Sequence, residues 1–85
     1  MNVYRLEPAD PDHPSWRHTI EQELVWACAA TPEQARQLVA TKSVAPGSEV
    51  VQSPWLDPKA SSCVLDETMK LFDAGDVVRQ DGSAL

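Results

Sequence analysis

Glycine, basic residues and long apolar runs are all scarce in this chain. The three glycines, Gly47, Gly75 and Gly82, each stand alone, which excludes the glycine-rich loops that cradle phosphate groups. Seven Lys and Arg against thirteen Asp and Glu give a net charge of −6, so the electrostatic field of the protein repels nucleic acid. No run approaches the roughly 18 to 20 apolar residues of a membrane span, and the N-terminus has no basic region followed by an apolar one. We therefore expect a cytoplasmic protein with neither a nucleic-acid nor a membrane partner.

The chain has too few cysteines for a secreted scaffold that is held together by disulfides. The chain has two cysteines, Cys28 and Cys63, whereas small secreted domains that rely on disulfides are rich in them. We expect both as reduced, buried thiols that behave as small hydrophobes, even if their strands make them neighbours.

Length and composition fit one soluble globular domain. The 85 residues are 42% hydrophobic and 24% charged, and a chain of this size buries only about 60 to 65% of the surface that its unfolded form exposes. A single small domain over residues 1–85 is the prediction. After Asp73-Ala74-Gly75 few apolar anchors remain, so residues from about 74 to 85 are expected to form a loose acidic tail.

Strand patterns recur along the chain. The segments that alternate in polarity or are rich in strand formers are residues 3–7, 23–30, 49–52 and 61–65. The clearest is 23–30, where the small Ala27 and Ala29 share one face and leave room for a helix, while Trp26 and Cys28 share the other. Because both faces are apolar, this segment predicts a central strand with Trp26 in the core. Residues 66–72 fit either a short helix or a continuing strand.

Thr31-Pro32-Glu33-Gln34 is the strongest local signal, since Thr31 can cap a helix, Pro32 is preset for its first turn and Gln34 completes a capping box. The helix is predicted from Thr31 to about Lys42, ended by the Pro46-Gly47 turn. It would place Ala35, Leu38 and Val39 on its apolar stripe and Arg36, Gln37 and Thr41 outside. Together the elements predict an α+β domain with one main helix packed on an antiparallel sheet of three or four strands.

Candidate chemistry is confined to His13, His18, Cys28 and Cys63. None of them forms a metal-ligand spacing, and there is no Gly-x-Ser-x-Gly nucleophile motif, so neither a metal nor a cofactor is expected. Cys63 would become a reactive thiolate only if His13 or His18 lay beside it. A small enzyme or metal-binding protein that uses His13, His18 or Cys63 is therefore the alternative function.

Two tryptophans lie in proline-rich loops. Trp16 is followed by Arg17, and Trp55 stands within Ser53-Pro54-Trp55-Leu56-Asp57-Pro58. Each tryptophan can fold back as a lid over one end of a small core. The other interpretation is an exposed anchor for a partner, because Trp and Arg are enriched at interface centres. Trp16, Arg17 and Trp55 are accordingly the candidate partner-binding residues.

The sequence resembles a family of short uncharacterised bacterial proteins. The resemblance rests on Tyr4-Arg5-Leu6, Asp10-Pro11, Pro14-Ser15-Trp16-Arg17, the Ala-rich strand that runs into Glu33, Ala35 and Arg36, and the Ser53 to Pro58 loop with Ser62-Cys63. It covers roughly residues 3 to 65. It implies a bacterial origin and a single small domain, and it carries over no activity, cofactor or catalytic residue.

The favoured function is a small interaction or regulatory module that binds a protein partner or itself. Residues 61–65 contain no charge and no proline, so this strand can pair with another chain if it lies at a sheet edge. A homodimer in which residues 53–65 contribute to the contact is the corresponding prediction.

Overall fold

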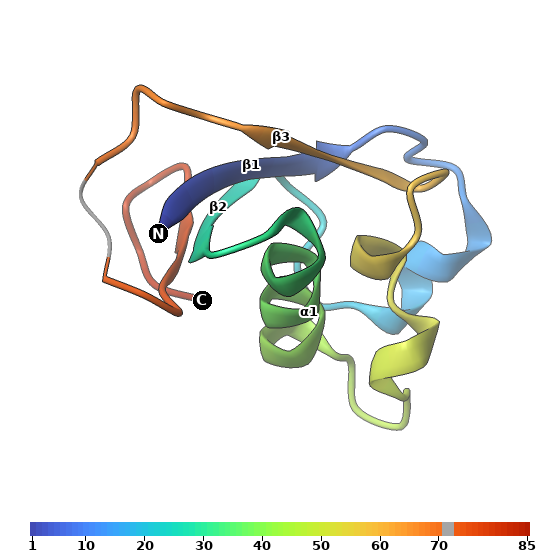
Figure 1. The fold of residues 1–85 in the computed structure, drawn as a ribbon. Helices are drawn as coiled ribbons and strands as arrows, with labels where there is room; N and C mark the ends of the chain where they lie inside the picture. Colours follow the sequence, from blue (N-terminus) through green and yellow to red (C-terminus); the bar gives the residue numbers. More distant parts are fainter. Residues whose placement is uncertain (71–72) are drawn as a thin grey trace.

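The computed structural model describes residues 1–70 and 73–85, and these fold into a sheet covered on one face by a helix (Figure 1). The strands are β1 (Asn2–Pro8), β2 (Val25–Ala29), β3 (Ser61–Leu65) and β4 (Val77–Arg79), and the α-helix is α1 (Pro32–Ser43). Three short 3₁₀ helices occupy the loops: η1 (Pro14–His18), η2 (Val50–Gln52) and η3 (Pro54–Leu56). The chain is an α+β domain with one main helix on an antiparallel sheet.

The sheet has the strand order β3-β1-β2-β4, with every neighbouring pair antiparallel. Within it, Leu6 of β1 lies opposite Val25 of β2 and Cys63 of β3. The prediction of strands at 3–7, 23–30 and 61–65 is confirmed, and β2 is a central strand as expected. The strands β3 and β4 form the two edges.

Helix α1 begins where the local sequence dictates. The Thr31 hydroxyl accepts a hydrogen bond from the Gln34 amide at 3.2 Å, Pro32 opens the first turn, and the Gln34 side chain accepts from the Ala30 amide at 3.3 Å. The contact with Thr31 satisfies one of the amides that a helix leaves unpaired at its N-terminus, and the contact with Ala30 holds the residue before the cap.

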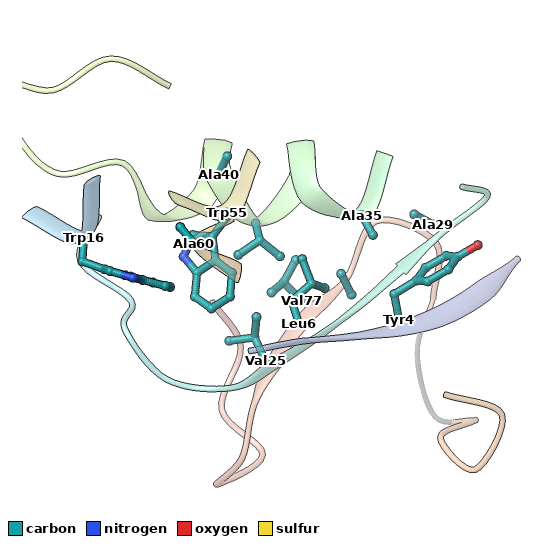
Figure 2. Packing of buried hydrophobic residues seen from close by; sticks show 12 residues of the cluster. Tyr4, Leu6, Trp16, Val25, Ala29, Ala35, Ala40, Trp55, Ala60 and Val77 are labelled. Atoms are coloured by element: carbon teal, nitrogen blue, oxygen red, sulfur yellow. The ribbon is translucent and has the colours of Figure 1, made fainter. Parts of the chain in front are cut away.

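The core lies between the sheet and α1 (Figure 2). Val25, Ala27 and Ala29 alternate onto the face that meets the helix, and Ala35 of α1 is fully buried there. Small side chains on both elements let the helix pack close to the strand. The remaining large members of the core are Tyr4, Leu6, Trp16, Val39, Trp55 and Val77.

The prediction of a strand at residues 49–52 is wrong. Residues Val50–Gln52 form a 3₁₀ turn in which the Gln52 side chain accepts from the Glu49 amide at 2.8 Å and the Gln52 amide donates to the Glu49 carbonyl at 3.0 Å. Pro54 follows immediately, and Val51 is 78% exposed. Local capping and the proline outweigh the strand preference of Val50-Val51, because that preference depends on packing against neighbouring strands.

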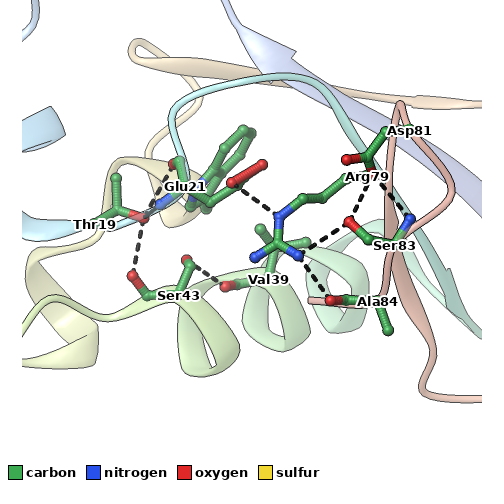
Figure 3. Close-up of polar contacts among 9 residues, drawn as sticks. Thr19, Glu21, Val39, Ser43, Arg79, Asp81, Ser83 and Ala84 are labelled. Carbon is green, nitrogen blue, oxygen red and sulfur yellow. Dashed lines mark hydrogen bonds and ion pairs between the residues drawn. The ribbon is translucent and has the colours of Figure 1, made fainter.

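The C-terminal residues are also more ordered than a loose tail. Strand β4 lies in this segment, with Val77 only 2% exposed opposite Ala27. The Arg79 guanidinium bonds to Glu21 Oε2 at 3.3 Å and to the Ala84 carbonyl at 2.7 Å (Figure 3). Residues 66–70 form an irregular segment with a turn, and the rest of the ambiguous 66–72 segment lies outside the described residues.

The predicted positions of two side chains, Trp26 in the core and Arg36 on the outside, are wrong. Trp26 is half-buried on the face away from α1, where its indole N–H donates to Asp66 Oδ2 at 3.0 Å. Arg36, expected outside, is also half-buried and reaches across to η3 and β3. Trp26 lies outside the core because the strand alternation gives the core face to Val25 and Ala27.

Candidate functional site

The tryptophans proposed as anchors are both buried. Trp16 is 6% exposed and Trp55 is 0% exposed, and their rings meet edge to face with centroids 5.1 Å apart. The Trp16 indole donates to the Asp10 carbonyl at 2.7 Å, and the Trp55 indole donates to the Glu21 carbonyl at 3.1 Å. As folded, neither ring is accessible to a partner, so both act as lids that close one end of the core.

Arg17 is exposed, and its contact is local: its Nε donates to His18 Nε2 at 3.3 Å. His18 Nδ1 in turn lies 2.9 Å from the Ser48 hydroxyl. The three residues predicted to bind a partner, Trp16, Arg17 and Trp55, therefore do not form one exposed patch.

His13 lies between a serine and an aspartate. Its Nδ1 accepts from the Ser15 amide at 3.2 Å and lies 2.7 Å from the Ser15 hydroxyl, while its Nε2 is 3.6 Å from Asp57 Oδ2. The order Ser-His-Asp is that of a catalytic triad. However, the serine lies on Nδ1 and the aspartate on Nε2, the reverse of their positions in that triad. The three residues fasten η1 to the loop after η3.

Cys63 is not activated in the way that the alternative function requires. Burial raises the pKa of its thiol, the Arg36 cation opposes that change and the Glu33 carboxylate adds to it. Its Sγ lies 3.8 Å from the Pro32 carbonyl. No imidazole is among these groups. Within residues 1–70 and 73–85, no three His, Cys, Asp or Glu side chains gather closely enough to hold a metal ion.

The two cysteines lie on opposite faces of the sheet. Cys28 pairs with Val3 on the face away from α1, whereas Cys63 pairs with Leu6 on the core face. Strand β1 stands between them, and their partners Val3 and Leu6 are three residues apart along it, so the two Cα atoms are farther apart than two strand spacings of roughly 9.5 Å. That separation exceeds the reach of a disulfide, so the two cysteines do not pair with each other.

The two edges of the sheet differ in how they are covered. At β4 the C-terminal residues fold back: the Arg79 amide donates to the Ser83 carbonyl at 2.8 Å, and the Leu85 amide donates to the Val77 carbonyl at 2.9 Å. In Figure 1, β3 runs along the rim of the sheet with β1 on its inner side. The edge formed by Ser61–Leu65, called the β3 edge below, is therefore the candidate binding surface.

The pairing with β1 determines which groups of β3 point outward. The Asp66 amide donates to the Val3 carbonyl at 2.8 Å, and bonded and non-bonded pairs alternate along an antiparallel ladder. By the register, Val64 and Ser62 therefore bond to β1. The amide and carbonyl groups of Cys63 and Leu65 point away from it, toward the outside of the sheet.

Apolar side chains accompany these outward-pointing groups. Val64 and Leu65 are each 47% exposed, and they are neighbours in sequence on opposite faces of the sheet. Val64 shares its face with the half-buried Trp26 and Val78, and α1 covers only the other face. The β3 edge thus combines free main-chain hydrogen-bonding groups with exposed apolar surface.

Two shallow hollows lie beside the N-terminal end of β1. One of about 500 Å³ lies between α1 and the Ala74-Gly75 turn and is mostly apolar, with Leu38 and Ala29 among its lining residues. The other, of about 380 Å³, is bordered by Leu65, Asp66 and Met69. The second hollow also has Glu67 and Lys70 in its lining. No described helix is long and apolar enough to cross a membrane.

The sequence contained one signal for the β3 edge, the absence of charge and proline in residues 61–65. It did not reveal the strand order that places these residues at an edge of the sheet.

Comparison of the chain with protein-family models, with curated proteins and with solved structures finds no match.

Proposed function

We propose that this protein is a small cytoplasmic interaction module that binds a protein chain along the β3 edge. The observation that carries the proposal is the contrast between the two edges: β4 is covered by the chain's own C-terminal residues, whereas β3 exposes Val64 and Leu65 beside outward-pointing main-chain groups. The placement of Cys28 and Cys63 on opposite faces of the sheet, with no disulfide between them, accords with a reducing compartment.

Binding by strand addition uses two kinds of contact. The outward amide and carbonyl groups of Cys63 and Leu65 hydrogen-bond to an extended segment, which supplies affinity with little regard to sequence. The side chains of Val64 and Leu65 then favour apolar residues at two neighbouring positions of that segment, one on each face of the sheet. An acidic partner segment is disfavoured because this chain carries a net charge of −6.

The Arg36 side chain, on α1, holds the start of β3 in place. Arg36 Nη1 donates to the Trp55 carbonyl at 3.0 Å and to the Ser61 hydroxyl at 2.9 Å, and Nη2 donates to the Ser61 carbonyl at 3.1 Å. These bonds fix the start of β3 against η3 and α1. A strand that is already ordered loses less conformational entropy on binding.

The test is a comparison of proteins captured from native lysate by immobilised wild type and by Val64→Lys, Leu65→Lys and Val51→Lys. Val51 is the matched control because it is an exposed valine on η2, outside the sheet. A protein captured by wild type and by Val51→Lys, and lost with both edge variants, supports the proposal. Capture that is the same for all four proteins, or absent for all, would overturn it.

A further inference from the structure

We infer that the occupant of the β3 edge is a second copy of this chain, paired antiparallel about a two-fold axis through Val64. The inference rests on the proposed function and names the partner. The two copies would form one continuous eight-stranded sheet, since each contributes the four strands described above.

The register follows from the positions of the outward-pointing groups. Cys63 and Leu65 flank Val64, so an axis through Val64 pairs Cys63 of each copy with Leu65 of the other. Each such pair exchanges two main-chain hydrogen bonds, which gives about four across the seam. Val64 faces its own counterpart in a non-hydrogen-bonded pair, the arrangement in which opposite side chains approach most closely.

The alternative registers use fewer of these groups. An axis through Cys63 would pair Leu65 with Ser61, but the Ser61 amide already donates to the Asp57 carbonyl at 3.0 Å and its carbonyl accepts from Arg36 at 3.1 Å. An axis through Leu65 would pair Cys63 with residue 67, which lies beyond β3. The axis through Val64 keeps every seam bond within β3 and does not use the Ser61 groups that are already bonded.

The same register covers the exposed apolar side chains. Val64 packs against its counterpart on the open face of the sheet, and Leu65 packs beside Cys63 of the second copy on the α1 face. Both side chains are 47% exposed in a single copy. No charged residue lies within Ser61–Leu65, so no like charges oppose each other within the paired strands.

The contact is small, and each copy carries a net charge of −6. A short edge contact belongs to the weak class of interfaces, so the dimer should form over a micromolar to millimolar concentration range. Because salt screens the repulsion between two acidic copies, the dimer should tighten as ionic strength rises.

Sedimentation equilibrium across that concentration range tests the pairing. The mass of wild type and of Val51→Lys should rise from 9.3 kDa toward twice that value, and more steeply in high salt. Val64→Lys and Leu65→Lys should stay monomeric, because each would bring two lysines to the seam. Far-UV circular dichroism checks that both variants remain folded.

Cross-linking tests the register independently of those lysine variants. Under a mild oxidant, Val64→Cys in a Cys63→Ser background should give a disulfide-linked dimer on a non-reducing gel. Ser62→Cys in the same background should not, because position 62 lies opposite position 66 of the second copy. A dimer in which Val64→Cys fails to cross-link would overturn the proposed register.

A wild-type mass of 9.3 kDa at every concentration in high salt would overturn self-pairing. If Val64→Lys still abolished capture of another protein from lysate, the proposed function would stand with a different partner. If capture were also unchanged by Val64→Lys, both proposals would fall.

Discussion

Arg36 connects three parts of the fold, and its replacement should lower the free energy of unfolding. Its guanidinium, on α1, bonds to the Trp55 carbonyl of η3 and to both the hydroxyl and the carbonyl of Ser61 on β3. Trp55 and Ser61 are fully buried residues. In Arg36→Met the methionine keeps much of the apolar stem but supplies no donor, so the two carbonyls lose their charged partner.

The expected loss can be estimated from these contacts. Hydrogen bonds from a charged donor contribute about 1.5 to 3 kcal/mol each, and a buried acceptor left without a partner costs about 1 to 3 kcal/mol. The three bonds belong to one group and are not additive, so we expect Arg36→Met to lower the free energy of unfolding by about 2 to 4 kcal/mol. That is a large share of the roughly 4 to 13 kcal/mol expected for a chain of this length.

Urea unfolding followed by tryptophan fluorescence measures this loss, because the buried Trp16 and Trp55 report on the region around Arg36. Arg36→Lys should recover part of the stability, since a lysine keeps the charge and donors but not the planar fork. Gln37→Ala is the control on the exposed side of α1 and should change stability by less than about 0.5 kcal/mol. A loss for Arg36→Met no larger than that of the control would refute this account of Arg36.

Three further predictions concern the core, the acid range and the thiols. In urea unfolding, Trp55→Ala should lower the free energy of unfolding by about 3 to 5 kcal/mol. Trp26→Ala, at a half-buried site, should lower it clearly less. Equal losses for the two variants would contradict the assignment of Trp55 as a lid over the core. Hydrogen bonds, mainly from the Thr68 hydroxyl and the Trp26 indole, lower the pKa of Asp66 below its ordinary 3.8. Their stabilisation is complete above pH 3.8 and is lost as the pH falls through the lowered pKa. In acid unfolding, the free energy of unfolding of Asp66→Asn should therefore fall less than that of wild type between about pH 5 and pH 2. Equal decreases for the two proteins would contradict this prediction. Intact mass should be the same with and without reductant, because Cys28 and Cys63 lie on opposite faces of the sheet; a 2 Da difference, the two hydrogens lost in disulfide formation, would show the register to be wrong.

Much of the fold follows from local patterns in the sequence. Thr31, Pro32 and Gln34 start a helix through contacts within one turn, so their effect does not depend on the rest of the chain. The alternation of Val25, Ala27 and Ala29 with Trp26 and Cys28 likewise predicts a strand with two distinct faces. At residues 49–52 the local signals competed. There the capping contacts and the following proline outweighed the strand preference of the β-branched Val50 and Val51.

Strand β4 could not be found in this way. It has only three residues, and it is stabilised by pairing with β2, about fifty positions earlier in the chain. Arg79 adds contacts to Glu21 and Ala84 that no local pattern records. A short strand whose stability comes from distant partners leaves almost no local trace.

The sequence by itself determined the α+β class, the start of α1 and the lack of charge in residues 61–65. Only the tertiary structure decided that Trp16 and Trp55 are buried lids, that Arg36 bonds to η3 and β3, and that β3 lies at an open edge. The reason is physical: capping and alternation act over a few residues, whereas burial, edge position and the partners of a long side chain depend on segments brought together from distant parts of the chain.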